Sequence, residues 1–464
     1  MLKVRVPAKA SLWYVASSVL AKGISALTTP IFTRLLTPEQ FGLYPLYLSW
    51  LSIFTIIISL ELSGAVIYRG LQKFEDAKNE FISASFGLFL CVFIIFCSLY
   101  FAFSTYINSI IGLDTFVTFL MLCTIFANTV IGFYSARARY EYKYMKATII
   151  NFVSSLLTPL LSIALILLTY YKSEARIIAS TFVLSFIGTY ALISILKRSS
   201  SLYKKDVWLF LLRFNLPLLP HYLAVGMILR IGDIVIGRAY GTEALGKYSV
   251  ATSVGMALTV VTGGLLSALA PWMLRRLKCS ETEKIRDLLL MLTKGLCVLT
   301  LLLLSAAPEL LSILTPPAFH TVLIAIFPIA LSVIPIFLSN AITSAESYFE
   351  KSYVTALPSI ISALISTLLA LLILPRVDYR FAGLFVLISY LFLTTLNTIV
   401  FRRLSGELPI KVKQTLTVFA LTALYSIPLF LFRNVILSRI ILALPLLPIG
   451  FILAKEAYSK VMEK

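Results

Sequence analysis

Ionisable side chains interrupt long apolar stretches of this 464-residue sequence, most clearly at Lys22, Glu61, Arg230 and Asp233. A charged group at the centre of a membrane-spanning helix costs at least about 2.5–3.5 kcal/mol, so each needs a partner or a water-filled surrounding. In a medium of low dielectric constant, an embedded cation attracts phosphate and carboxylate groups strongly. Embedded carboxylates can take up protons or sodium ions. These residues therefore predict two kinds of binding, that of anions by the embedded cations and that of protons or sodium ions by the embedded carboxylates.

Lys22 is the deepest of these charges, about ten residues or roughly 15 Å into its apolar stretch. A polar residue recurs around it every three or four positions, which places the set on one narrow face of a helix: Ser18, Lys22, Ser25 and Thr29. A lysine that reaches the lipid headgroups is the alternative, but the depth of Lys22 disfavours it. This face predicts one wall of a polar cavity.

A second polar face runs along residues 211–236 and contains Asn215, Tyr222, Arg230 and Asp233. Arg230 and Asp233 are three residues apart and can pair, so a structural ion pair and a functional site are equally supported. Glu61 is interpreted as a proton or sodium site, or as the counter-ion of Lys22.

The amino-acid composition indicates the class of protein in which these residues lie. The chain is 59% hydrophobic and 13% charged, with a mean hydropathy of +0.95, which is typical of membrane proteins. The apolar stretches do not alternate as the strands of a membrane barrel would, so an all-α polytopic protein is expected. Hydropathy predicts about fourteen spans, near 11–32, 43–66, 81–104, 115–136, 147–170, 177–196, 211–236, 246–271, 287–307, 319–348, 353–375, 382–401, 412–432 and 435–457.

The net charge of +19 follows the predicted topology. Roughly 27 of the 40 lysines and arginines fall in the segments on the side of the N-terminus, against about 9 on the other side. Both termini are therefore expected in the cytoplasm. A nucleic-acid partner is not expected, because the charge is spread over short loops instead of forming one patch.

No catalytic pattern is present. The sequence contains no HExxH, GxSxG, Walker or DxD motif, its two histidines are isolated, and its five cysteines form no CxxC pair. We therefore expect neither an enzyme, nor a metal site, nor a cofactor. A proton or a sodium gradient remains the expected energy source for any transport.

One short segment occurs twice. TRLLTPEQFGLYPLYLS (33–49) and GRAYGTEALGKYSVATS (237–253) share Arg, Glu, Gly, Tyr and Ser at matching positions. Both segments fall between predicted spans on the outer side, which indicates a parallel repeat of two six-helix lobes. The predicted divisions are 1–206 (helices 1–6), 207–408 (helices 7–12) and 409–464 (helices 13–14 and a tail). The repeat would place Lys22 and Arg230 on corresponding helices.

Two stretches, 17–50 and 214–256, resemble the O-antigen and exopolysaccharide flippases, Wzx-like polysaccharide biosynthesis proteins of the superfamily that contains the MATE exporters, also called the MOP superfamily. The similarity includes the proline-rich start FNLPLLP, Asp233 and the turn LGKY. It implies two lobes around a cavity that opens alternately to either side of the bacterial inner membrane. It also implies a cargo, an undecaprenyl-pyrophosphate-type lipid-linked oligosaccharide, and a polysaccharide polymerase and chain-length proteins as partners.

The site hypothesis combines this resemblance with the embedded charges. Lys22 and Arg230, with Arg34 or Arg238 near the outer mouth, are expected to bind the anionic head group. Ser18, Ser25, Thr29, Asn215 and Tyr222 are expected to line the cavity, and Glu61 or Asp233 to couple transport to an ion gradient. Arg34 and Arg238 have an equally supported alternative, in which each pairs with a glutamate of its own loop.

Two other functions remain open from the sequence. A MATE-type exporter of drugs or small molecules would share the fold but would favour an acidic cavity. A non-transport membrane partner of a polysaccharide synthesis complex would need no polar faces on two corresponding helices.

Overall fold

The computed structural model describes residues 20–21, 23–141, 143–198, 201–349 and 352–462. In this part of the chain, twelve helices are long and apolar enough to cross a membrane, or thirteen if one bent pair counts as a span. They coincide with the second to fourteenth predicted spans. Residues 11–19 and 22 of the first predicted span, 11–32, lie outside the described residues, so the count of fourteen stays a prediction.

The chain forms two compact units, with the boundary inside helix α10 (Leu219–Ala239). The first unit runs to Gly226 and includes Gly241–Glu243, and the second contains Met227–Tyr240 and the chain from Ala244 onward. The lobe boundaries predicted from the sequence stay a prediction.

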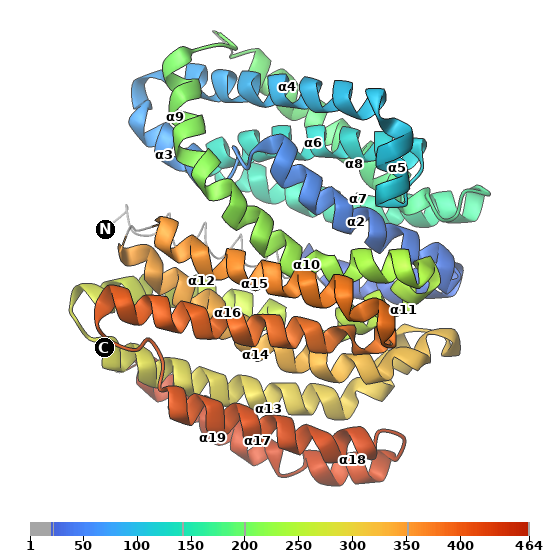
Figure 1. The fold of residues 1–464 in the computed structure, drawn as a ribbon, viewed down its shortest axis with the longest axis vertical. Coiled ribbons are helices and arrows are strands. Elements are labelled where there is room, and N and C mark those ends of the chain that lie inside the picture. Colours follow the sequence, from blue (N-terminus) through green and yellow to red (C-terminus); the bar gives the residue numbers. More distant parts are fainter. Residues whose placement is uncertain (1–19, 22, 142, 199–200, 350–351, 463–464) are drawn as a thin grey trace. The chain divides into compact units, whose positions relative to one another are not determined.

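In the first unit, long helices lie side by side, with α8 packed against both α6 and α7 (Figure 1). Residues 23–35 are helical ahead of them. The remaining elements are α2 (Pro38–Ser59), α3 (Ala65–Lys73), η1 (Glu75–Ala77), α4 (Lys78–Ala102), α5 (Ser104–Ile111), α6 (Thr115–Tyr140), α7 (Tyr144–Leu168), α8 (Ala175–Leu196), α9 (Lys205–Asn215) and η2 (Leu216–Leu218).

In the second unit, α14 and α16 form the most extensive helix pair, and α13 packs on α14. The elements after α10 are α11 (Gly241–Gly255), α12 (Thr259–Lys278), α13 (Thr282–Leu314), η3 (Pro317–Val322), α14 (Leu323–Glu346), η4 (Ser347–Phe349), α15 (Ser352–Leu372), η5 (Leu374–Arg376), η6 (Tyr379–Phe381), α16 (Ala382–Ser405), α17 (Val412–Leu431), α18 (Ile436–Ala443) and α19 (Leu446–Met462).

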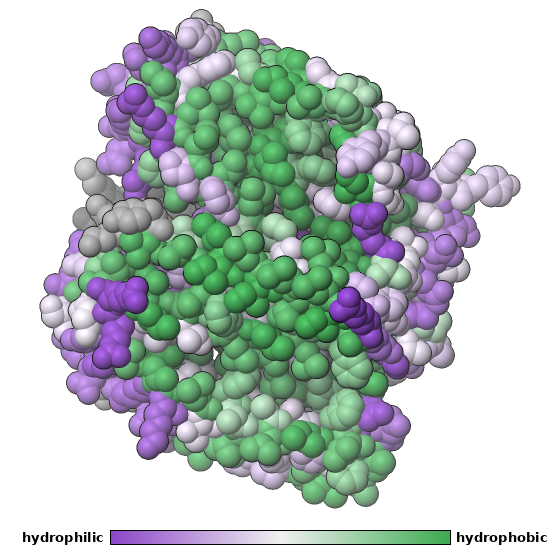
Figure 2. Space-filling model, viewed as in Figure 1, coloured by the Kyte–Doolittle hydropathy of each residue, from purple (hydrophilic) through white to green (hydrophobic). Residues whose placement is uncertain are grey.

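The surface has the distribution expected for helices in lipid. On the face shown in Figure 2, hydrophobic residues extend along the helices of each unit, and hydrophilic residues gather toward the helix ends. Many large apolar side chains are exposed, including Phe186 at 74% and Leu168 at 82%. A water-soluble protein rarely exposes so much contiguous apolar surface, whereas lipid chains solvate it without cost.

The predicted span 43–66 is not one continuous helix. Helix α2 ends at Ser59, and α3 begins only at Ala65. Between them, Leu60 and Glu61 both have positive φ, at 48° and 51°. Residues other than glycine seldom adopt this left-handed conformation, so the surrounding structure must hold the break open.

The predicted span 246–271 is also broken. Helix α11 ends at Gly255, and the next helix is bent by 47° relative to it. A Cβ atom at Gly255 would lie 2.6 Å from Cγ2 of Ile329, so glycine permits a close approach of α11 to α14.

The two copies of the repeated segment fold alike. The helix over 23–35 is followed by α2, which begins at Pro38 with a capping box from Thr37. In the second copy, α10 ends at Ala239 and α11 begins at Gly241. Both copies are helix–turn–helix hairpins, and the repeat of two six-helix lobes stays a prediction.

The second hairpin is fixed by Tyr240. Its hydroxyl group donates a hydrogen bond to the carbonyl oxygen of Leu374, at 2.8 Å, and contacts that of Val377. Its ring packs against Tyr379, with 5.7 Å between ring centroids. The turn after α10 is therefore tied to the turn after α15.

The three C-terminal helices, α17, α18 and α19, pack on α13. Arg439 of α18 joins them to it, because its guanidinium forms a two-point ion pair with the Glu309 carboxylate, one contact being 2.6 Å. The same guanidinium donates to the carbonyl oxygen of Ser305. The Arg439 side chain is only 5% exposed, and its two Nη atoms find these partners, whereas its Nε has none among the described residues.

Replacing Arg439 with methionine should destabilise the attachment of α18. We expect a loss of about 1.5–3 kcal/mol in the free energy of unfolding, the usual contribution of a hydrogen bond to a charged group. Thermal unfolding in detergent measures it, with Arg433→Met as control, since the contacts of Arg433 among the described residues are local, to the carbonyl oxygen and the ring of Phe430. Equal midpoints for the two variants would contradict a structural role of the ion pair.

Candidate functional site

The break between α2 and α3 is held by a residue from the end of α9. The side-chain amide of Asn215 donates a hydrogen bond to the carbonyl oxygen of Leu60, which the broken helix leaves without its usual partner. Asn215 is only 2% exposed, and its side-chain oxygen has no hydrogen-bond partner in the described residues. Within the break, the Glu61 amide donates to the Ser59 hydroxyl at 3.1 Å. The break is therefore a built feature and not a frayed helix end.

Glu61 is placed by this break. Its side chain is half-buried, and no cationic side chain of the described residues pairs with it. It interacts electrostatically with Tyr222 of α10. Helix α10 comes close to α2 here, because a Cβ atom at Gly226 would lie 3.0 Å from Cδ1 of Ile56. Of the predicted site residues, the first unit thus brings Glu61, Asn215 and Tyr222 together.

Arg230 and Asp233 meet in the second unit. Nη1 of Arg230 lies 3.5 Å from Oδ2 of Asp233, and the side chains are 39% and 11% exposed. Asp233 also interacts electrostatically with Tyr248 of α11. The contact between the two charges is long and single, so the other guanidinium donors of Arg230 are available to a second anion.

The remaining predicted residues lie at helix ends or on the helix over 23–35. Arg34 is exposed and donates to the carbonyl oxygen of Pro30 at 3.0 Å. Arg238 is exposed at the end of α10. Ser25 is exposed, and the Thr29 hydroxyl donates to its carbonyl oxygen at 2.8 Å. Ser18 and Lys22 lie outside the described residues, so their positions stay predictions.

Comparison with known protein families identifies the family of this chain. The family model described as "Polysaccharide biosynthesis protein" matches residues 8–277, more than half of the chain, including both repeated hairpins. The chain belongs to the polysaccharide biosynthesis protein family. The resemblance noted from the sequence is thereby confirmed.

A curated relative of this family member is "Lsg locus putative protein 1" of Haemophilus influenzae, which is 24% identical over 286 residues. The match covers 58% of this chain and 66% of that protein, just under two thirds of its length.

Solved structures share the fold of this polysaccharide biosynthesis protein over most of its length. The lipid II flippase MurJ, in an inward closed conformation, matches with a TM-score of 0.72 at 10% identity, over 97% of this chain and 100% of MurJ. An inward-facing multidrug resistance MATE transporter of the MOP superfamily matches with a TM-score of 0.65 at 13% identity, over 83% and 95%. The proteins with this fold are flippases and transporters, not enzymes. The predicted all-α polytopic class is confirmed.

No pattern in the sequence of this family member pointed to Arg176, a cation that joins helices of the first unit. Arg176, at the start of α8, is surrounded by aromatic rings, its guanidinium carbon lying 4.3 Å from the ring centroid of Phe32, 5.1 Å from that of Phe41 and 4.1 Å from that of Tyr44. Such cation–π contacts are worth about 0.5–2 kcal/mol each. They fix the first hairpin to α8. Residues so far apart in sequence show no common spacing, so no pattern pointed to this cluster.

Replacing Asn215 with leucine should loosen the break after α2. The Leu60 carbonyl would lose its partner, at a cost of about 1–3 kcal/mol, or roughly fivefold or more in the local opening equilibrium. Hydrogen–deuterium exchange of peptides covering 60–65 should therefore rise at least about fivefold. The matched control is Asn151→Leu on α7, whose side chain forms no hydrogen bond to the described residues. Unchanged exchange at 60–65 would show that Asn215 does not hold the break.

Proposed function

We propose that this polysaccharide biosynthesis family member is a flippase, a secondary transporter that works by alternating access. Its cargo is a polyprenyl-pyrophosphate-linked oligosaccharide, of the undecaprenyl type, moved from the cytoplasmic to the outer leaflet for O-antigen, capsule or exopolysaccharide synthesis. The observation that carries this proposal is the family match, which joins a polysaccharide pathway to a transporter fold. The protein would act in the bacterial inner membrane with both termini in the cytoplasm, beside a polymerase and chain-length proteins.

The embedded cations supply the binding chemistry. Lys22 and Arg230 would attract the pyrophosphate and any sugar acid from corresponding helices, with Arg34 or Arg238 near the outer mouth. The exposed fraction of Arg230, 39%, and its single long contact to Asp233 leave donors for such an anion. The polyprenyl tail would remain in the bilayer while the head group crosses.

A MATE-type exporter of drugs or small molecules is the other function that the fold allows. Cationic drugs require acidic sites, whereas Lys22 and Arg230 would repel them. The match to the MATE transporter also covers less of this chain, 83% against 97% for MurJ. Both considerations favour an anionic lipid-linked cargo.

Lys22→Ala should reduce glycan export in cells at least about tenfold, because loss of one charge-assisted contact of about 1.5–3 kcal/mol weakens binding by that factor or more. Surface glycan is measured together with the amount of membrane-inserted protein. Lys172→Ala, on an exposed loop, is the matched control. Export at the normal rate by Lys22→Ala would refute the head-group role.

Glu61 is the proposed coupling residue, since it is half-buried, lies in an unwound segment and pairs with no described cation. Backbone breaks that face a cavity are where transporters bind coupling ions. In proteoliposomes, flipping of a fluorescent lipid-linked glycan by Glu61→Gln should no longer respond to an imposed proton or sodium gradient. Asp233→Asn should keep the response. The reverse pattern would assign coupling to Asp233.

A further inference from the structure

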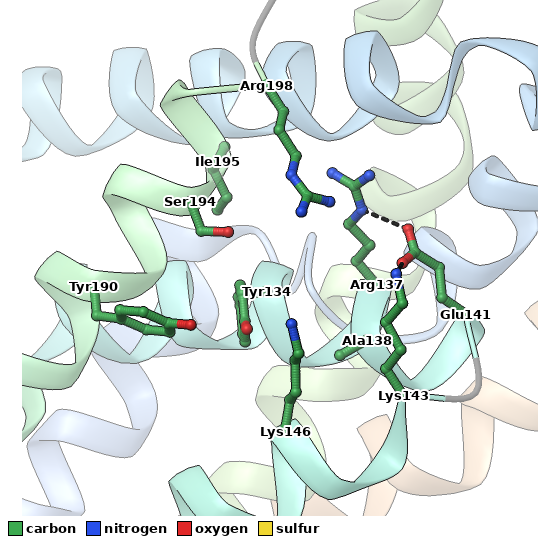
Figure 3. Close-up of a pocket in the computed structure, with 10 residues that line it drawn as sticks. All are labelled: Tyr134, Arg137, Ala138, Glu141, Lys143, Lys146, Tyr190, Ser194, Ile195 and Arg198. Atoms are coloured by element: carbon green, nitrogen blue, oxygen red, sulfur yellow. Dashed lines mark hydrogen bonds and ion pairs between the residues drawn. The ribbon is translucent and has the colours of Figure 1, made fainter.

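A basic pocket lies at one end of the first unit, where α6 and α8 end and α7 begins (Figure 3). Its volume is about 120 Å³. The charge distribution of the sequence predicts that this end faces the cytoplasm. The lining residues are Tyr134, Arg137, Ala138, Glu141, Lys143, Lys146, Tyr190, Ser194, Ile195 and Arg198.

The one carboxylate in the pocket is already engaged. Glu141 accepts hydrogen bonds from Nε of Arg137, at 2.8 Å, and from Nζ of Lys143, at 2.6 Å. Burial raises the pKa of this carboxyl, but the hydrogen bonds and charges of Arg137 and Lys143 outweigh it and lower the pKa to about 2. Arg137 also donates to Oδ1 of Asn79, at 2.5 Å, which orients its guanidinium.

Two further cations line the pocket without a carboxylate. Within the described part of the chain, neither Lys146 nor Arg198 forms an ion pair. Figure 3 shows the ammonium group of Lys146 and the guanidinium groups of Arg137 and Arg198 turned toward a common space, with Tyr134 and Tyr190 beside it. Four cationic side chains against one carboxylate leave a net charge of +3. The space between them is suited to an anion.

Size and surroundings narrow the identity of this anion. A pocket of 120 Å³ is well below the roughly 300–1,000 Å³ of sites for drug-sized ligands, so it has room for a phosphate group but not for an oligosaccharide. Exposed apolar side chains lead away from the pocket along α8 at intervals of three and four residues: Phe182, Phe186, Tyr190 and Ile193. An acyl chain could lie along this surface while its headgroup occupies the pocket.

We propose that this pocket binds the phosphate of an anionic membrane phospholipid. Basic pockets between transmembrane helices on the cytoplasmic side are known to suit such headgroups. Compensation of helix dipoles and the positive-inside bias explain why cations lie at this end of the unit. They do not explain why the cations of three helices converge on one small space with two tyrosines. The bound lipid would join the ends of α6, α7 and α8. This inference does not depend on the proposed cargo.

The test uses the full-length protein in detergent and the double variant Lys146→Gln/Arg198→Gln, which leaves Glu141 and its partners intact. Binding of phosphatidylglycerol, followed by native mass spectrometry, should weaken at least about tenfold. The control is Lys197→Gln/Lys205→Gln, which removes the same charge from exposed positions that do not line the pocket. Its binding should stay within about twofold of the parent protein. Thermal unfolding confirms that both variants are folded.

Competition experiments distinguish a phospholipid headgroup from inorganic phosphate and from polyprenyl pyrophosphate as the ligand of the pocket. Phosphatidylglycerol should bind more tightly than phosphatidylcholine, and inorganic phosphate should displace it only weakly. Equal losses in the two double variants would overturn the proposal, because the effect would then be one of general charge. Displacement by inorganic phosphate at equal concentration would overturn the lipid assignment. Displacement by polyprenyl pyrophosphate alone would overturn it as well, and would assign the pocket to the transported lipid.

Discussion

A backbone carbonyl group that a broken membrane helix leaves unpaired needs another donor within the protein, and Asn215 shows how this family member supplies one. The broken helix after Ser59 frees the carbonyl group of Leu60 in this way. The side-chain amide of Asn215, the last residue of α9 in the same unit, donates a hydrogen bond to this carbonyl group. The left-handed conformation of Leu60 and Glu61 can therefore persist, and with it the position of a carboxylate that a continuous helix would have turned elsewhere.

Three arginines of the described residues have partners of different kinds. Arg439 is held by a carboxylate and a carbonyl group, Arg176 by three aromatic faces, and Arg230 by a single long contact to Asp233. The first two join helices to one another, although Nη1 of Arg176 and Nε of Arg439 have no hydrogen-bond partner among the described residues. Arg230 differs in its exposure, because 39% of its side chain is open to the surroundings and its remaining donors can reach an anion. Charge alone does not distinguish these three cations; their exposure and their partners do.

The sequence predicted those features that depend on composition along a single stretch. Apolar length located the second to fourteenth spans, and the repeated segment marked two hairpins with the same local structure. The breaks at Ser59 and Gly255 were not predicted, because the residues that contact them, Asn215 and Ile329, lie far along the chain. The Arg176 cluster and the pocket at the end of α6 were missed for the same reason. The grouping of Glu61 with Asn215 and Tyr222 likewise required the fold, since hydropathy gives depth but not neighbours.

The two repeated hairpins, alike in backbone, are secured by unlike chemistry. The first depends on a cation against aromatic faces, and the second on a phenol that donates to carbonyl groups. A single substitution can therefore release one hairpin and leave the other in place. Because the two attachments share no residue, a change at Arg176 and a change at Tyr240 act on different hairpins. How firmly each hairpin is held can therefore differ within one chain.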